Sequence, residues 1–185
     1  MMPNSSFPRY KLVTIVCVTL FCFALAEGQS KPKPNLAGTW IVDSAKSEKT
    51  NNLFEDSESS MTIQQSDPEI RMARQFKVVS KPVTFVFFSD DREENHKNPI
   101  TGMETKARTK WDGDKLVIHY TGSGVSPMGV RYLNVIEELK LSKDGNTLTK
   151  KIILVVQRNA PDRVNAVPVS QSNQEYKKVY NRASE

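Results

Sequence analysis

Asn35-Leu36-Ala37-Gly38-Thr39-Trp40 is the stretch of sequence on which the fold prediction rests. A glycine two residues before a tryptophan suits a strand whose backbone passes close to another segment. The large indole ring can close one end of a hydrophobic core. Short strand patterns follow this stretch, so we expect the folded domain to begin here.

The residues before this stretch have the three parts of a secretory signal peptide. Arg9 and Lys11 form a basic start without acids, residues 12–25 are an apolar run, and Ala24-Leu25-Ala26 offers small residues for cleavage. The run is shorter than the ~20 residues that cross a bilayer. We expect residues 1–26 to be removed, with a retained anchor as the alternative. The protein would then be exported, periplasmic or secreted, with no stable membrane span, and residues 27–35 would form a flexible tether.

Composition narrows the function classes. The 185 residues carry 26 Lys and Arg against 21 Asp and Glu, a formal net charge of +5, and the basic residues are dispersed along the chain. Nucleic-acid surfaces need clustered basic residues with stacking aromatics, so we predict no nucleic-acid partner. Both cysteines, Cys17 and Cys22, lie in the expected leader. The exported part therefore has no thiol for catalysis, metal binding or disulfides.

Alternating apolar and polar residues predict about nine strands and no long helix. Asp112-Gly113 and Asp144-Gly145 supply hairpin turns. Four longer loops are expected at residues 43–60 (with one helical turn), 90–101, 121–129 and 159–172. Hairpin after hairpin favours an all-β fold, a single antiparallel up-and-down β-barrel, over a sandwich. The predicted strands cover residues 40–42, 60–65, 70–79, 83–88, 104–111, 116–120, 130–141, 147–157 and 176–182.

Four segments can be compared with known families: Ala37-Gly38-Thr39-Trp40, Ala45-Lys46-Ser47, 110–116 and 141–148. Together they resemble small exported bacterial lipocalin-like proteins without assigned activity, over most of residues 36–182. The G-x-W start and the basic end of the last strand resemble lipocalin and calycin barrels. The resemblance implies a lipocalin-like barrel over 36–182, closed by Gly38 and Trp40, with Arg182 (or Lys178) across the indole ring. The Thr-Asp-Tyr triplet and the common disulfide of true lipocalins are missing.

Two charged residues interrupt the apolar faces of their strands. Arg74 lies among Ile70, Met72 and Phe76, and Glu137 lies between Val135 and Leu139. A lone charge in an apolar interior is costly, whereas a paired one is tolerable. Either both contact a polar ligand inside the barrel, or a β-bulge turns each outward. The predicted ligand-binding residues are Arg74, Glu137, His119 and Trp111.

The sequence does not decide whether the barrel interior is empty or filled by side chains. Small inward residues (Thr105, Ala107, Thr109) indicate space, whereas a bulky set indicates a filled barrel. That bulky set is Phe76, Phe85, Phe87, Leu139 and Leu154.

Signals for catalysis or cofactors are weak. The two histidines, His96 and His119, have no second ligand at zinc spacing, and residues 90–95 lack the pattern of a calcium loop. No nucleophile elbow or phosphate loop is present. We expect no catalytic residue, metal or cofactor, and no protein partner can be named. The predicted function is non-catalytic: binding a small apolar or amphipathic ligand, or acting as an envelope-associated scaffold. The alternative is a calycin-like enzyme acting on a lipid or small molecule, with Arg74, Glu137 and His119 converging in the barrel mouth.

Overall fold

The computed structural model describes residues 32–50, 53–97, 104–126, 129–159 and 170–184. All of these except Pro32 belong to one compact unit, Lys33–Glu185. The predicted leader, residues 1–26, and the first part of the predicted tether lie outside the described residues.

Ten strands and one short helix make up the described part of this unit. The helix, α2 (Leu53–Asp56), lies in the predicted 43–60 loop, where one helical turn was expected. The strands are β1 (Gly38–Val42), β2 (Glu58–Ser66), β3 (Glu69–Phe76), β4 (Val83–Phe88), β5 (Asp90–Lys97), β6 (Glu104–Asp112), β7 (Lys115–Ser126), β8 (Gly129–Leu141), β9 (Thr147–Asn159) and β10 (Ser170–Arg182).

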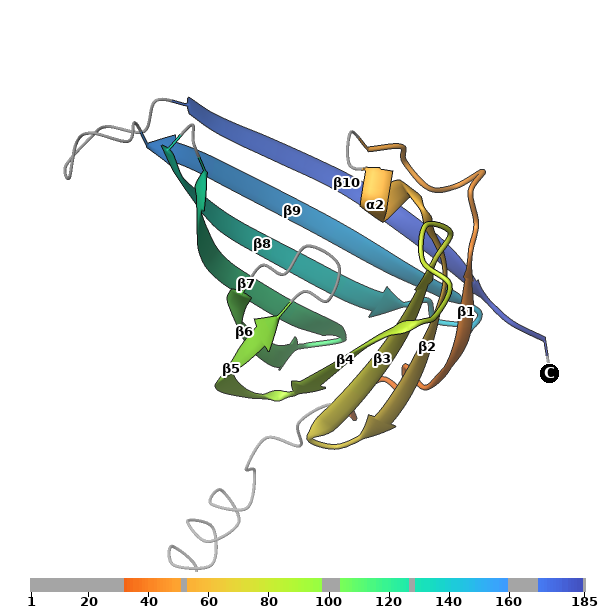
Figure 1. Cartoon of the computed structure of the whole chain (residues 1–185). Helices are drawn as coiled ribbons and strands as arrows, with labels where there is room; N and C mark the ends of the chain where they lie inside the picture. The colour runs from red at the N-terminus through yellow and green to blue at the C-terminus, as the bar shows by residue number, and fades with distance from the viewer. Residues whose placement is uncertain (1–31, 51–52, 98–103, 127–128, 160–169, 185) are drawn as a thin grey trace, which may run out of the picture. The chain divides into compact units, whose positions relative to one another are not determined.

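All ten strands form one antiparallel sheet that curls into a nearly closed barrel. Each strand pairs with its neighbour in sequence except at one place, and β1 pairs with β10, so that the sheet edges are β4 and β5. Figure 1 shows β1–β4 standing opposite the long strands β7–β10. Side chains join the two edges: the Phe88 amide donates to Glu94 Oε2 (3.2 Å), and the Phe87 and His96 rings stack with centroids 5.1 Å apart. The predicted up-and-down barrel is confirmed, with ten strands rather than about nine.

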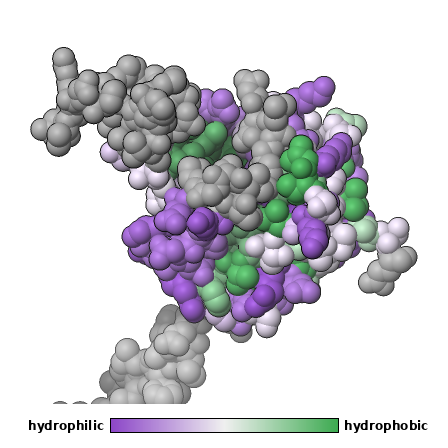
Figure 2. Space-filling view, in the orientation of Figure 1, coloured by the Kyte–Doolittle hydropathy of each residue, from purple (hydrophilic) through white to green (hydrophobic). Residues whose placement is uncertain are grey.

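The extra strand corrects the sequence prediction. Residues 90–101 were expected to be a loop, but β5 occupies Asp90–Lys97. This edge strand carries no apolar residue. Its outward Glu93 forms ion pairs with Lys106 (2.6 Å) and Arg108 (3.5 Å) on β6. Hydrophilic side chains gather over this region in Figure 2.

A second predicted loop is also strand. β7 continues to Ser126 and β8 begins at Gly129, so residues 121–126 and Gly129 belong to paired strands rather than to a loop. Gly122 explains the misleading signal, since its position is packed rather than flexible. A Cβ there would lie 2.9 Å from the Thr105 methyl group and 3.0 Å from the Glu104 carbonyl oxygen. Absence of a side chain lets β6 and β7 approach closely.

Trp40 lies at one end of the barrel in what we call the floor cluster. Its indole is fully buried, and Nε1 donates to the Leu36 carbonyl oxygen at 2.9 Å. Such a cluster, removed from water, is the main apolar contribution to the stability of the domain. The cluster comprises Leu36, Trp40, Met61, Ile63, Ile70, Met72, Phe87, Leu116, Ile118, Leu139, Leu148 and Tyr180.

Arg182 lies over the Trp40 ring at 4.3 Å from the ring centroid, the contact predicted from the sequence. Its guanidinium also donates to the carbonyl oxygens of Ala37 (2.8 Å) and Gly145 (2.9 Å). The backbone of Gly38 has φ +136°, and a Cβ there would lie 2.5 Å from Arg182 Nη1. Glycine at this position therefore leaves the space that the guanidinium occupies.

Within the described residues, we find no helix with the length and apolar character needed to cross a membrane.

Candidate ligand site inside the barrel

Directly beside the floor cluster, the barrel interior becomes charged. Along β9, Leu148 belongs to the floor cluster, and Lys150 occupies the next inward position. Six ionisable side chains from α2 and five strands gather there, each with 12% or less of its side chain exposed. We call this set the charge cluster: Glu55 (α2), Glu58 (β2), Arg74 (β3), Glu137 (β8), Lys150 (β9) and Lys178 (β10).

Arg74 and Glu58 form the best-paired part of the charge cluster. The Arg74 guanidinium donates from Nη2 to Glu58 Oε2 at 2.8 Å and from Nε to Oε1 at 3.2 Å. Such a bidentate pair has both the charge and the planar geometry that a guanidinium favours. Arg74 also lies over the Phe76 and Phe85 rings at 5.3 and 5.9 Å. The Arg74 side chain is thus held by the Glu58 carboxylate and by two aromatic rings.

The two lysines occupy the cluster differently. Lys150 Nζ donates to Glu58 Oε2 at 2.6 Å and to Glu55 Oε2 at 3.4 Å. Lys178 Nζ lies 3.8 Å from Glu58 Oε2 and 4.0 Å from Glu55 Oε2, and within the described residues it has no hydrogen-bond partner. The neighbouring Tyr180 hydroxyl, also buried, has none either among those residues. Two buried polar groups on β10 therefore have no hydrogen-bond partner among the described residues.

In the charge cluster, the pKa values of Glu58, Glu137 and Lys178 are shifted, and the two carboxyls among them shift in opposite directions. Burial alone raises the pKa of the Glu58 carboxyl, but the Arg74 and Lys150 charges outweigh it and hold the pKa far below its usual range. For Glu137, burial dominates and raises the pKa despite the Arg74 charge. Burial and the Lys150 charge lower the pKa of Lys178. Glu58 is therefore firmly ionised, whereas burial disfavours the charged forms of Glu137 and Lys178.

Strand alternation explains how these side chains reach the interior. Lys150 shares a strand face with the buried Leu148 and Ile152, and Lys178 shares one with the buried Tyr176 and Tyr180. Because successive strand residues face opposite sides, a charge at these positions must point inward. The same rule directs Arg74 and Glu137 inward.

An apolar wall continues from the charge cluster along β8 and β9. Val135 and Leu154 are cross-strand partners on the inner face and lie one inward position beyond Glu137 and Ile152. Both are half-buried, whereas Ile152 is fully buried. On β6, which is separated from β8 by β7, Ala107 and Thr109 are buried small residues. The arrangement places a polar layer beside a partly accessible apolar one.

No protein-family model and no curated protein sequence matches the chain. Solved structures do match. One, a mutant of the REP1-NXSQ fatty acid transporter, is 16% identical, with 80% of this chain and 98% of that chain covered and a TM-score of 0.48. Human cRBP IV is 15% identical, with 81% and 99% covered and a TM-score of 0.51. The chain has a lipocalin-like calycin barrel. At this level of identity, the likeness concerns the fold.

Two of the predicted ligand-binding residues meet inside this calycin barrel. Arg74 Nη1 lies 3.6 Å from Glu137 Oε1, and both residues are buried. The β-bulge interpretation, in which both turn outward, is wrong. Cross-strand pairing is regular at both positions, and each side chain finds an opposite charge. Trp111 also faces inward, where it packs against the floor cluster.

His119 does not join them. It alternates with Ile118 and Tyr120 of the inner face, and its Nε2 lies 2.8 Å from Asn134 Oδ1 on β8 at the outer surface. The structure therefore does not bring Arg74, Glu137 and His119 together, as the enzyme alternative required. Within the described residues, no group of three or more His, Cys, Asp or Glu side chains is arranged to hold a metal ion.

Four members of the charge cluster were missed from the sequence. Lys150 and Lys178 carry the same signal that indicated Arg74, a charge among inward apolar positions. Lys178 was predicted only as an alternative partner for the Trp40 ring. Glu58 lies ahead of the predicted start of its strand, and Glu55 lies in the predicted loop. The alternation of apolar and polar residues therefore gives no signal for Glu55 or Glu58.

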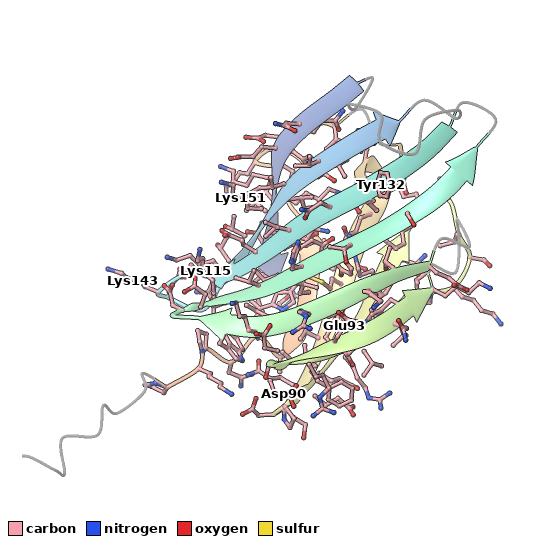
Figure 3. The ribbon with its side chains drawn as sticks, turned by 90° about the vertical axis from the view of Figure 1, so that its left-hand side faces the viewer. Asp90, Glu93, Lys115, Tyr132, Lys143 and Lys151 are labelled. Carbon is pink, nitrogen blue, oxygen red and sulfur yellow. The ribbon has the colours of Figure 1, made fainter. Side chains whose placement is uncertain are left out.

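The outer face of the sheet shows a different arrangement of charge. Figure 3 shows Lys115, Tyr132 and Lys151 on the side of β7–β9 that faces the viewer, with Glu93 on β5. Lys115 pairs with Glu138 at 3.2 Å and Lys151 with Glu175 at 2.8 Å, all with a quarter or more of the side chain exposed. Such exposed pairs contribute little to stability.

Proposed function

We propose that this protein is an exported, non-catalytic barrel that binds a small amphipathic ligand. The ligand's polar group would lie at the charge cluster, and its apolar part would lie along the inner face of β8 and β9. The observation that carries this proposal is the gathering of six buried ionisable side chains inside a calycin barrel, with the Lys178 ammonium left without a hydrogen-bond partner among the described residues.

Stability alone is a poor reason for such a cluster. Removing charges from water costs several kcal/mol per ion, and buried ion pairs are often no better for stability than apolar side chains of similar size. The outer-face ion pairs show that this chain can satisfy charges at the surface. A cluster retained inside the barrel, next to an apolar floor, is more readily explained by recognition of a polar group.

Amphipathic character follows from the neighbours of the cluster. Lys178 and Tyr180 offer polar hydrogens without partners among the described residues, whereas Val135 and Leu154 offer half-buried apolar surface one position beyond Glu137. Small Ala107 and Thr109 limit the side-chain volume that β6 contributes. A pure hydrocarbon would leave the buried charges facing apolar carbon, at a desolvation cost.

Export and lack of catalysis belong to the proposal as well. Export is supported by the tripartite pattern of residues 1–26 and by a cysteine-free remainder. A non-catalytic role is supported by the position of His119 on the outer face, away from Arg74 and Glu137.

Intrinsic fluorescence tests the binding proposal. Trp40 and Trp111 are the only tryptophans of the chain. A panel of fatty acids, quinones and isoprenoids is titrated against tryptophan emission and against the melting temperature. A ligand at about 100 times its Kd stabilises the folded state by about 2.7 kcal/mol, which a melting curve detects.

Two lysine variants locate the site. Lys178→Met removes the inward ammonium, and Lys177→Met removes an exposed one from the adjacent, outward position. We expect Lys178→Met to weaken binding about tenfold or more, the loss of one charged hydrogen bond, and Lys177→Met to leave it unchanged. If no compound in the panel changes emission or melting temperature, the barrel is filled and a scaffold role becomes the better interpretation.

A further inference from the structure

The two carboxylates that the cations share are held differently. Glu58 lies within the paired strand β2, its side chain is fully buried, and its shortest contacts are 2.6 and 2.8 Å. Glu55 comes from α2, outside the sheet, and 12% of its side chain is exposed. Its contacts with Arg74 are 3.2 and 3.3 Å, and its contact with Lys150 is 3.4 Å. Glu55 is therefore the more accessible of the two anions and lies farther from the shared cations.

The cations around Glu55 have more donor capacity than Glu55 uses. Three cationic groups from three strands converge on its carboxylate: Arg74 at 3.2 Å, Lys150 at 3.4 Å and Lys178 at 4.0 Å. The Lys178 ammonium has three hydrogens and no hydrogen-bond partner among the described residues. A carboxylate that approached Lys178 more closely than Glu55 does would gain hydrogen bonds there.

We propose that the Glu55 carboxylate holds the place of a ligand's own carboxylate, so that an amphipathic carboxylic acid displaces Glu55 from Arg74, Lys150 and Lys178 when it binds. This inference rests on the proposed function and specifies its ligand class. The exchange is balanced in charge, because one carboxylate leaves the three cations as another arrives. A neutral amphiphile cannot make this exchange, since it would leave the cluster with an excess of positive charge.

Two consequences separate this exchange from simple binding. First, Glu55 competes with an acid for the same cations but does not compete with an alcohol or ester that leaves the cluster undisturbed. Second, α2 carries Glu55, so an acid must move α2 away from the cations whereas a neutral ligand need not. When a ligand must displace an internal group, its apparent affinity falls, because only the fraction of protein in which that group has moved away can bind it.

The competition is tested with three matched ligands: an unsaturated C18 fatty acid, its methyl ester and the corresponding alcohol. Their affinities are measured for the wild-type protein, for Glu55→Gln and for Glu48→Gln. Glu48→Gln is the matched control, because it changes the charge by the same amount on the same connection between β1 and β2. Glu48 is exposed and accepts a hydrogen bond from the Lys177 amide. We expect Glu55→Gln to bind the acid about tenfold more tightly, with no change for ester or alcohol. Glu48→Gln should match the wild type for all three.

Hydrogen exchange provides a second measurement that needs no variant, in case Glu55→Gln does not fold. In the wild-type protein, saturation with the acid should speed exchange in peptides that cover Leu53–Asp56, and saturation with the alcohol should not. Unchanged or slower exchange with bound acid would overturn the inference. So would equal affinity of Glu55→Gln and wild type for the acid.

The outcomes distinguish this inference from the proposed function. If acid, ester and alcohol all bind with similar affinity and Glu55→Gln changes none of them, the barrel binds amphiphiles but Glu55 is not a stand-in. If none of the three binds wild type or Glu55→Gln, both proposals are wrong.

Discussion

The floor cluster and the charge cluster occupy neighbouring levels of one barrel, yet different forces hold them together. In the floor cluster, apolar side chains such as Leu116 and Leu148 are fully buried, and their contribution is nondirectional and independent of pH. In the charge cluster, buried ions depend on specific partners within 2.6–4.0 Å. One inward position on β9, from Leu148 to Lys150, separates the two regimes.

This difference shows where the chain is optimised for stability and where it is not. An apolar interior could continue past Leu148, since Ile152 follows on the same face of β9. Lys150 interrupts it, and this lysine and two further cations lie among three acids from other elements. The cost of burying a charge recurs on several elements, and the proposed binding of a polar group would give a reason for it.

The largest expected effect comes from Glu58→Gln. This change leaves Arg74 and Lys150 without their closest carboxylate, and loss of one partner of a buried pair costs about 3–5 kcal/mol. The cost should be measured by chemical denaturation at neutral pH. Glu175→Gln, which removes one exposed partner of Lys151, is the matched control and should cost less than about 1 kcal/mol.

The pH dependence of Glu58→Gln follows from its lowered pKa. A carboxyl whose folded pKa lies below its unperturbed value of 4.5 contributes stability above that value and loses it as the pH falls toward the folded pKa. The gap between wild type and Glu58→Gln should therefore narrow below about pH 4.5. A gap that stays constant with pH would show that Glu58 acts through packing and not through charge.

Leu148→Ala tests the other regime. Truncating a fully buried leucine leaves a cavity and costs about 2–5 kcal/mol. The loss should be the same at pH 7 and pH 4, measured by the same denaturation series. If the cost of Leu148→Ala varied with pH as that of Glu58→Gln does, the two clusters would be one coupled unit rather than two regimes.

The sequence predicted the floor cluster better than it predicted the charge cluster. Period-2 alternation located most strands, and the Gly38–Trp40 pair with Arg182 located the floor contact. β5 escaped because an edge strand with one charged face has no apolar alternation to detect. The extension of β7 past Gly122 escaped because glycine signals a turn as readily as close strand packing.

For the site, alternation is informative only inside a correctly bounded strand. Arg74 and Glu137 were found because they stand among apolar neighbours. Lys150 and Lys178 meet the same condition, but the pairing of strands distant in sequence, which turns isolated charges into a cluster, is not visible in any one of them. Glu55 supplies its carboxylate from a one-turn helix, where no periodicity exists.

Arg182→Ala should weaken the floor by a smaller amount. A cation–π contact contributes about 0.5–2 kcal/mol, depending on burial. The variant also loses two hydrogen bonds to backbone carbonyls, so both the melting temperature and the Trp40 emission should change. Arg71→Ala, an exposed arginine paired with Glu69 on β3, should leave Trp40 emission unaltered. Unchanged melting and emission in Arg182→Ala would mean that the ring is held without the guanidinium.

The smallest effect, and the only one expected to be stabilising, comes from Glu137→Gln. Burial raises the pKa of the Glu137 carboxyl, so the folded protein favours its neutral form more than the unfolded chain does. Such a group contributes stability below its unfolded pKa and loses that contribution as the pH rises through its folded pKa. Glutamine is neutral at every pH, so the variant keeps what the wild type loses.

At pH 7 we therefore expect Glu137→Gln to be more stable than wild type by about 1 kcal/mol, roughly the effect of a pKa difference of one, with the gain disappearing toward pH 4. Arg74 keeps Glu55 and Glu58 as counter-charges in this variant, so its own charge stays compensated. Denaturation curves at the two pH values measure the difference. A loss of stability at pH 7 that disappears at pH 4 would show instead that Glu137 is an ionised partner of Arg74. The sign of this single change thus shows whether burial or the Arg74 charge has the larger effect on the ionisation of the Glu137 carboxyl.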